Sequence, residues 1–391
     1  MNKIKKYALS ELYDMSSGIS STKEQSGHGA PFVSFKTVFN NYFLPEELPD
    51  LMDTNEKEQE TYSIKMGDVF ITRTSETVDA LAMSCVAVKD YPKATFSGFV
   101  KRLRPKTTGI VYSKYIAFFL RSKYFRKVLD CNTIMTLRAS FNEDMFSFLY
   151  LYLPDYEEQV RIGDLLYKME MKIRTNNKIN DNLEQQAAAL FSSLYNRSNT
   201  EVRYTDLIQI LGGGTPKTGE TAYWNGNIAF FTPKDVGTPY TFITEKTITE
   251  EGLSHCNSRL YPVNTVFVTA RGTVGKVGLS GIPMAMNQSC YALVGKETHQ
   301  LLVYFYTLKA VDRLKHKASG AVFDAITTRD FDSEQIMKLS DDDAKAFLCV
   351  AEPMFQEMLN NSIENLRLST LRDFLLPKLM SGEIDVSSVQ L

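Results

Sequence analysis

The stretch Ile162–Leu194, IGDLLYKMEMKIRTNNKINDNLEQQAAALFSSL, decides the fold of this chain. Ten of its positions follow an unbroken spacing of four and three residues: Ile162, Leu166, Met169, Ile173, Asn176, Asn180, Leu183, Ala187, Leu190 and Leu194. Such a spacing of mostly apolar residues is the seam of a long helix that pairs with another helix. The stretch therefore predicts a helix and, elsewhere in the chain, a partner for it.

A second seam of the same kind occurs 185 residues later. Its members are Phe347, Ala351, Met354, Met358, Asn361, Asn365, Leu368, Arg372, Leu375 and Leu379. Arg372 is the single charged member, and Pro353 predicts that the regular part of this helix starts near Met354, because proline disrupts a helix interior. Two matching seams in one chain predict an antiparallel coiled coil.

Asparagines occupy the same two slots in both seams: Asn176 and Asn180 in the first, Asn361 and Asn365 in the second. If the helices pair antiparallel, all four meet at the centre of the coil. A buried asparagine layer costs stability but fixes the register of a coiled coil. The alternative is that these asparagines are solvated on ordinary amphipathic helices.

Two further features repeat between the halves of the chain. Phe32–Val38 and Phe230–Val236, which lie 198 residues apart, each place apolar residues around a lysine. Asp68–Arg73 and Thr265–Arg271 are runs that end in arginine. The β-branched and aromatic content of these runs is typical of strands.

The chain therefore alternates between strand-rich domains and helices. The predicted fold class is α+β, with two tandem strand-rich domains, each followed by a long helix. The two helices are expected to pair as an antiparallel coiled coil with pseudo-two-fold symmetry. The predicted boundaries of domain, helix, domain and helix are 1–153, 154–195, 196–335 and 336–391.

Charge follows the same alternation. The whole chain of 391 residues has a formal net charge of −2, but the net charges of residues 1–153, 154–195, 196–330 and 331–391 are +3, −2, +3 and −6. Phosphate binding needs a basic surface where the phosphates are contacted, and it does not need a net positive charge on the whole protein. The pattern is therefore compatible with DNA binding.

Composition also excludes several classes of protein. No apolar run approaches the roughly 20 residues that span a bilayer, and the basic start of the chain leads into no apolar signal segment. The five cysteines form no Cys-x-x-Cys pair and there are only four histidines, so neither a zinc site nor a disulfide framework is expected. We expect a cytoplasmic protein.

Several motifs of this chain resemble those of type I restriction–modification specificity (S) subunits. Two groups resemble motifs of a target-recognition domain: Gly213–Pro216 with Tyr223–Ile228 and Phe231–Asp235, and Ala270–Gly275 with Met286–Ser289. Two others resemble the conserved helices of that family: Glu157–Ile162 running into Lys178–Asn180, and Leu371–Ile384. The first domain departs from this pattern, because Ser17–Ser21 stands where Gly-Gly-Thr-Pro is expected and no Tyr-Trp follows.

The resemblance implies a DNA-recognition subunit that reads a bipartite, asymmetric target in double-stranded DNA. It implies two methyltransferase (M) subunits bound to the helices and restriction (R) subunits in the full complex. S-adenosylmethionine and ATP with Mg²⁺ are then expected on those partners, and no cofactor, metal or catalytic residue on this chain. The alternative is a stand-alone two-domain DNA-binding regulator on the same scaffold.

Polar loop residues are the candidates for DNA contact, because Lys and Arg bind phosphates while Arg, Asn and Gln read base edges. In the first domain the candidates are Ser21, Lys23, Lys36, Arg73, Thr74 and Ser97. In the second domain they are Thr215, Lys217, Lys234, Arg271, Lys276, Asn287 and Gln288.

No enzyme motif is complete. The loops that an amino-methyltransferase needs are missing, and a nuclease site from Asp155, Glu170 and Lys172 would need adjacent strands, whereas Glu170 and Lys172 lie in the predicted helix. Gly272–Gly278 lacks the spacing of a phosphate-binding P-loop, so we interpret it as a glycine-loosened hairpin that can approach DNA, or as a plain tight turn. Trp224 is interpreted as a packing anchor in preference to a base-stacking residue.

Overall fold

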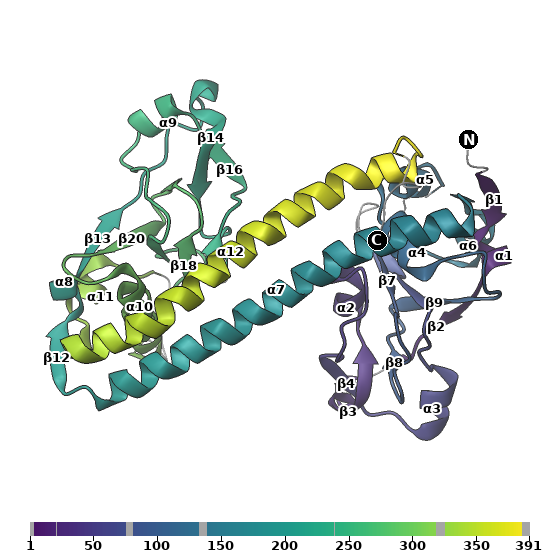
Figure 1. The fold of residues 1–391 in the computed structure, drawn as a ribbon, viewed down its shortest axis with the longest axis horizontal. Coiled ribbons are helices and arrows are strands. Elements are labelled where there is room, and N and C mark those ends of the chain that lie inside the picture. The colour runs from purple at the N-terminus through teal and green to yellow at the C-terminus, as the bar shows by residue number, and fades with distance from the viewer. Residues whose placement is uncertain are drawn as a thin grey trace. The chain divides into compact units, whose positions relative to one another are not determined.

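The computed structural model describes residues 4–20, 22–75, 81–132, 139–237, 239–317 and 325–384. By contacts the chain divides into two compact units (Figure 1). The first unit comprises Met1–Ile173 with Leu366–Leu391, and the second comprises Arg174–Asn365. Each unit contains one strand-rich domain and part of each of the two long helices. None of the helices in the described ranges is long and apolar enough to cross a membrane.

The first unit is built on a four-stranded antiparallel sheet in the order β2-β9-β5-β7. These strands are β2 (Tyr13–Ser17), β9 (Val100–Pro105), β5 (Val69–Thr72) and β7 (Ser84–Val86). A three-stranded sheet adds β4 (Asp50–Met52), β3 (Ser26–Val33) and β8 (Thr95–Phe96), and two strand pairs join β1 (Lys5–Ala8) to β11 (Tyr150–Leu153) and β6 (Thr74–Ser75) to β10 (Ala139–Ser140). The short helices are α1 (Leu9–Leu12), α2 (Phe35–Asn40), α3 (Glu56–Thr61), α4 (Ser113–Phe119), α5 (Lys123–Asn132) and α6 (Glu143–Phe148).

The second unit repeats this plan with one more strand, β15, in its main sheet. Its main sheet has the order β13-β20-β17-β18-β15, with strands β13 (Ile208–Gly212), β20 (Cys290–Gly295), β17 (Val266–Thr269), β18 (Val277–Ser280) and β15 (Tyr240–Thr241). The three-stranded sheet contains β16 (Lys246–Ile248), β14 (Trp224–Phe231) and β19 (Met284–Met286), and β12 (Thr200–Arg203) pairs with β21 (Gln335–Lys338). The remaining elements are α8 (Tyr204–Leu207), the 3-10 helix η2 (Thr221–Tyr223), α9 (Glu250–Ser254), α10 (Gln300–Lys317) and α11 (Thr328–Asp332).

The correspondence between the units extends to strand direction. In both three-stranded sheets the long strand runs parallel to one neighbour and antiparallel to the other, and it carries a register shift on the antiparallel side. The predicted internal repeat is therefore a repeat of topology, and the α+β prediction is confirmed.

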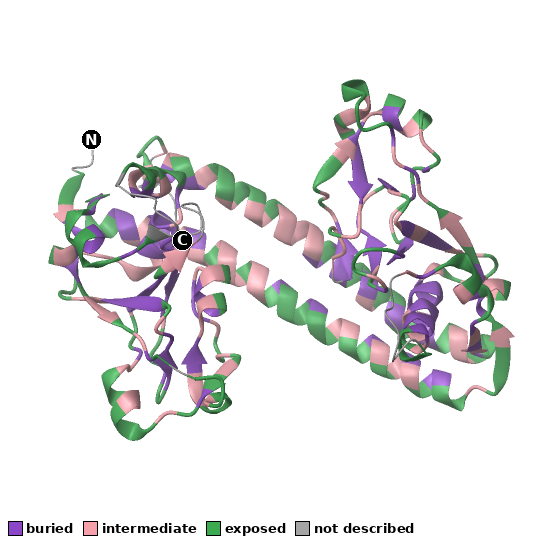
Figure 2. Ribbon diagram, turned by 180° about the vertical axis from the view of Figure 1, so that it is seen from behind, coloured by how far each residue is buried: buried purple, intermediate pink, exposed green. Residues whose placement is uncertain are grey.

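The two long helices are α7 (Tyr156–Arg197), with 42 residues, and α12 (Asp341–Met380), with 40 residues. Every member of the two predicted seams is buried or half-buried, and the positions between them supply most of the exposed faces (Figure 2). The seam prediction is thus confirmed for all twenty positions. In each unit, the α7 and α12 segments contribute seam residues to the same hydrophobic core.

The position of Pro353 is a correction. It lies inside α12, which begins at Asp341 and not near Met354. Proline removes one intrahelical hydrogen bond, to the carbonyl four residues earlier. Both Pro353 and Cys349, the residue whose carbonyl loses its partner, lie on the exposed side of the helix. Water can hydrogen-bond to that carbonyl, so the helix continues through the proline.

The predicted asparagine layer is present in the second unit. Asn176 donates to the side-chain oxygen of Asn365 at 2.9 Å, and Asn361 donates to that of Asn180 at 3.0 Å. Asn176, Asn180 and Asn361 are buried. Residue numbers rise along α7 from Asn176 to Asn180, while those of their partners on α12 fall from Asn365 to Asn361, so the two helices run antiparallel here. The alternative of solvated asparagines is excluded.

Arg372, the charged member of the second seam, is accommodated in the first unit by an ion pair. Its Nη1 lies 2.8 Å from Oε2 of Glu170 on α7, and the two side chains are only 14% and 12% exposed. The guanidinium also lies over the ring of Tyr42, 5.1 Å from the ring centre. A charge at an apolar slot is tolerated because it is paired there.

Candidate nucleic-acid interface

In the second unit, loops from distant parts of the chain meet at one end of the main sheet. The Gly214 N–H donates to the Met286 carbonyl at 3.1 Å, and the Asn287 N–H donates to the Phe231 carbonyl at 3.0 Å. The Ala270 N–H donates to the Ser289 carbonyl at 2.8 Å. These backbone bonds join the loops after β13, β14 and β17 to the loop before β20. We refer to residues 213–217, 232–235, 270–276, 286–289 and 325–327 as the second loop cluster.

All seven residues of this domain that were predicted from the sequence to contact DNA lie in the second loop cluster. Lys217, Lys234, Arg271, Lys276 and Gln288 are exposed, and Thr215 and Asn287 are half-buried. The Thr215 hydroxyl donates to the Gln288 side-chain oxygen, and Asn287 Oδ1 accepts from the Ser289 N–H at 3.1 Å. The polar groups that can read bases therefore lie beside cations that can bind phosphate.

The loop between β17 and β18 is the glycine-containing hairpin that the sequence indicated. Its strands pair antiparallel from Val266–Leu279 to Val268–Val277, and both Gly272 and Gly275 have positive φ, at 80° and 74°. Positive φ is strained for residues with a Cβ, so glycine is required at these two positions. The Thr273 hydroxyl donates to the Pro233 carbonyl at 3.1 Å, which ties the hairpin to the turn that carries Lys234.

Trp224 is a packing anchor, as interpreted from the sequence. Its indole N–H donates to the Lys217 carbonyl at 3.2 Å, and its ring packs edge-on against Phe230 with ring centres 5.5 Å apart. The Lys246 ammonium lies 5.6 Å from its ring centre. Trp224 thereby fixes the loop on which Lys217 is displayed.

The first unit contains a matching cluster held by the same kind of backbone bonds. The Ser97 N–H donates to the Val33 carbonyl at 3.0 Å, and the Gly98 N–H donates to the Ile19 carbonyl at 2.7 Å. The Arg73 N–H donates to the Phe99 carbonyl at 2.9 Å, and the Phe141 N–H donates to the Arg73 carbonyl at 2.8 Å. We refer to residues 18–20, 22–25, 34–36, 73–75, 97–99 and 139–141 as the first loop cluster.

The nominated residues of the first domain fall into three groups. Lys23, Lys36 and Arg73 are exposed, and Thr74 is half-buried in β6. Ser97 is only 7% exposed, and its hydroxyl accepts the Phe99 N–H at 3.2 Å. Because the Ser97 side chain is buried and bonded within its own turn, we do not propose that it contacts DNA. Ser21 lies outside the described residues.

Several basic side chains of the first domain have structural roles. Arg121 donates to four backbone carbonyls, those of Val38, Phe39, Asn41 and Ser84, at 2.7–2.9 Å. Burial lowers the pKa of its guanidinium. Arg104 forms a two-pronged pair with the buried Asp68 at 2.6 and 2.7 Å. A count of positive charges in the sequence therefore overstates the number of cations available to DNA.

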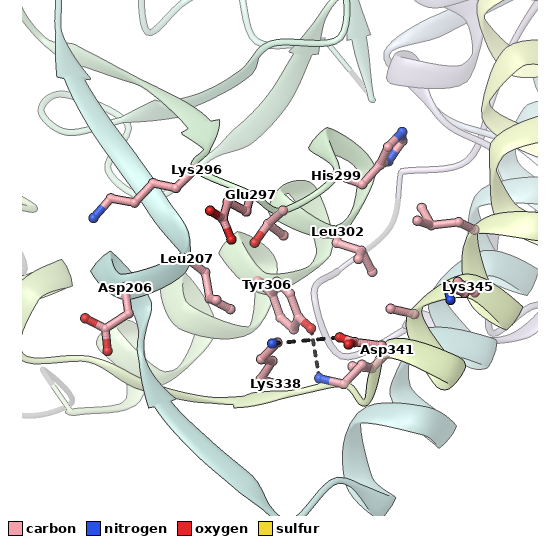
Figure 3. Close-up of a pocket in the computed structure, with 14 residues that line it drawn as sticks. Asp206, Leu207, Lys296, Glu297, His299, Leu302, Tyr306, Lys338, Asp341 and Lys345 are labelled. Atoms are coloured by element: carbon pink, nitrogen blue, oxygen red, sulfur yellow. Dashed lines mark hydrogen bonds and ion pairs between the residues drawn. The ribbon is translucent and has the colours of Figure 1, made fainter.

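A pocket of about 720 Å³ lies elsewhere in the second unit (Figure 3). It includes Leu207 and Lys296, at the opposite end of the β13–β20 pair from the second loop cluster. Its ionisable lining is balanced in number: it includes Lys296, Lys338 and Lys345, together with Asp206, Glu297 and Asp341, and Lys338 pairs with Asp341 at 3.9 Å. Nowhere in the described ranges do three or more His, Cys, Asp or Glu side chains gather as a metal site would require.

Two strand-rich domains of related strand order, each with a polar and cationic loop cluster and each followed by a long helix, are suited to contacting DNA through the two loop clusters. The chain belongs to the type I restriction modification DNA specificity domain family, whose model matches residues 1–185 and 196–338.

Known proteins agree with this assignment. The chain is 24% identical to the type I restriction enzyme HindI specificity subunit of Haemophilus influenzae, over 90% of this chain and 94% of that one. It is 32% identical to the MjaIX specificity subunit of Methanocaldococcus jannaschii over 30% of this chain and 29% of that one. The crystal structure of the type I restriction–modification S subunit from M. genitalium matches with a TM-score of 0.63 and 13% identity, covering 97% of this chain and 96% of that one. This match shows that the fold is shared.

Proposed function

We propose that the chain reads a DNA target in two specified parts, one with each loop cluster. The target-recognition domains in this proposal are residues 1–153 and 196–335, and the spacer segments 154–195 and 336–391 contain most of α7 and all of α12. The observation that carries the proposal is the repeated loop cluster, which presents exposed lysine and arginine at the same end of both main sheets.

The two parts of the target are expected to differ in sequence. Equivalent loops carry different side chains in the two domains: the Gly213–Lys217 loop has no Gly-Gly-Thr-Pro counterpart in the first domain. Base readout depends on side chains at groove edges, while phosphate contacts are insensitive to sequence. Different loops on one scaffold therefore produce an asymmetric target.

The proposed partners are two methyltransferase subunits and, in a full complex, restriction subunits. Support comes from the family and from relatives whose names place them in type I restriction enzymes. S-adenosylmethionine and ATP with Mg²⁺ belong to those partners in this proposal. We also propose that the complex acts in the cytoplasm, where the DNA is accessible.

The test is to express the chain with its methyltransferase partners and to sequence the methylated sites. The expected motif has two different specified parts around an unspecified spacer. Replacing residues 196–335 by the second domain of a relative should change one part only. A single continuous motif would contradict the proposal. Tight, site-specific binding by the chain alone would instead favour the stand-alone regulator.

A further inference from the structure

Phe99 is an exposed aromatic residue in the first loop cluster. Its side chain is 66% exposed, although it lies between two buried positions, Ser97 and Val100, with only Gly98 intervening. The exposed ring is therefore available for an apolar contact with a binding partner.

The exposure does not come from a loose loop. The Phe99 N–H donates to Ser97 Oγ at 3.2 Å, and its carbonyl accepts from the Arg73 N–H at 2.9 Å. The Val100 N–H donates to the Ser97 carbonyl at 2.9 Å. On the inner side, a Cβ at Gly98 would lie 2.9 Å from the Ile19 carbonyl oxygen, so the backbone is closely packed. The main chain around Phe99 is therefore fixed, and its ring projects outward.

The surroundings of Phe99 are polar and cationic. Arg73, whose backbone is bonded to Phe99, is exposed, and Lys23 is exposed on the β2–β3 loop of the same cluster. Lys101, two residues further on, is buried and bonded to the Ser17 hydroxyl at 3.0 Å and to Glu143 at 3.7 Å, so the accessible cations here are Arg73 and Lys23. An apolar ring among groups that bind phosphate fits a nucleic acid, because bases offer flat faces and thymine offers a methyl group.

The second domain lacks this ring. Ser289 occupies the corresponding place, since its carbonyl accepts the Ala270 N–H at 2.8 Å and the Arg271 N–H at 3.3 Å, as the Phe99 carbonyl accepts the Arg73 N–H. The two clusters share the backbone arrangement and differ in the side chain that it displays. Phe99 thus distinguishes the two recognition surfaces.

We propose that Phe99 is a specificity-determining residue of the first domain, whose ring makes an apolar contact with a base in one part of the DNA target. The inference rests on the proposed function, and it adds a residue that takes part in recognition through apolar contact and not through a hydrogen bond.

The test uses the complete complex with its methyltransferase partners. Phe99→Ala, Phe99→Leu and Phe99→Ser are compared with wild type on a DNA library in which each target position is varied. Phe99→Ala should reduce discrimination at one or two positions of a single part of the target by about tenfold. Phe99→Leu should retain more discrimination than Phe99→Ser. The matched control Ser289→Ala should leave that part unchanged.

Two modified DNAs identify the base contact. Deoxyuridine in place of thymidine removes only the methyl group, and should weaken wild type but not Phe99→Ala if the methyl is contacted. If the ring contacts a base face, 2-aminopurine at the neighbouring step should instead report Phe99-dependent unstacking. Equal loss on all sequences, unchanged discrimination by Phe99→Ala, or weaker assembly with the methyltransferase before DNA is added would each overturn the inference. Absence of sequence preference in the wild-type complex would instead contradict the proposed function.

Discussion

Asn361 on α12 donates a hydrogen bond to the side-chain oxygen of Asn180 on α7 at 3.0 Å, and both residues are at least 92% buried. Asn180 in turn donates to the Ser362 hydroxyl at 3.2 Å. A buried amide that loses its partner keeps the cost of its desolvation, while an apolar pair has no such requirement. The pair therefore specifies which residues of the two helices lie opposite each other.

Asn361→Ala should lower the free energy of unfolding by about 1–3 kcal/mol, because it leaves the Asn180 oxygen buried without its donor. The double variant Asn180→Leu/Asn361→Leu should regain most of that stability but pair its helices less specifically. Chemical denaturation measures the first effect, and cysteine crosslinking between α7 and α12 measures the second. A single crosslinking register in the double variant would contradict the proposed role.

Two carboxylates that join α7 to the strand-rich blocks should respond to pH in opposite directions. Burial alone would raise the pKa of Asp164, but hydrogen bonds from Lys114 at 2.8 Å and Tyr112 at 2.7 Å outweigh it and lower that pKa. Burial raises the pKa of Glu184, against the bond that it accepts from Tyr304 at 2.9 Å.

A carboxylate whose pKa is lower in the folded than in the unfolded state stabilises the folded protein when the pH is above the unfolded pKa. This stabilisation is lost as the pH falls through the folded pKa. Asp164→Asn should therefore destabilise the protein at neutral pH and lose its effect in acid. A raised carboxylate pKa has the opposite sign, so Glu184→Gln should stabilise at neutral pH, and the gain should fade as the pH drops through the raised pKa. Unfolding free energies of both variants from pH 3 to 8 check this. Parallel pH profiles would contradict it.

Lys234 and Arg271 should have separable effects on DNA binding. Lys234 is 80% exposed, and its ammonium lies 3.5 Å from the carboxylate of Glu245, which is also exposed, so Lys234→Ala should cost the fold little. It should weaken binding to all sequences similarly and reduce the salt dependence by about one unit. Arg271→Ala should relax preference at one position at a cost of about 1–3 kcal/mol. Binding titrations on cognate and non-cognate DNA decide, and identical losses for both variants on both DNAs would refute the assignment of Arg271 to base readout.

The half-chain 1–195 should form a symmetric dimer. The core of the first unit takes Leu376 and Leu379 from α12, and a second half-chain offers Phe191 and Leu194 at the equivalent positions, together with its own Asn176 and Asn180. An isologous interface presents the same recognition domain twice. With methyltransferase partners, the dimer should therefore modify a palindrome of one half-site. Light scattering and sequencing of methylated sites test this, and a monomer or an asymmetric site would contradict it.

The long helices could be predicted in detail because a coiled-coil seam is a local pattern. All four asparagines and the apolar positions are where the spacing put them, and the one error, at Pro353, arose from treating a proline on the solvent-facing side as a break. The number of strand-rich domains followed from the repeat. The order of strands in the sheets could not be predicted in this way. Strands β3 and β8 pair although more than 60 residues separate them in the chain, and no local pattern identifies such a partner.

The candidate site was predicted in part. The exposed lysines and arginines of both clusters were found because turn residues and cations mark loops. Ser97 was misjudged because a small polar residue in a turn looks the same in sequence whether its hydroxyl faces solvent or the Phe99 N–H. Phe99 was missed for the complementary reason: an aromatic residue is normally assigned to the core, and only the folded structure shows that it is exposed.

The loop clusters are fastened through main-chain atoms, as in the bonds from Gly214 to Met286 and from Asn287 to Phe231. Backbone groups are present whatever the side chain, so substitutions at exposed cluster positions should leave folding almost untouched. Substitutions at such positions can therefore accumulate, because they affect the choice of DNA target and not the stability of the fold. A lineage carrying this scaffold could therefore acquire a new target in one half through a few mutations, while the other half and the helices are inherited unaltered.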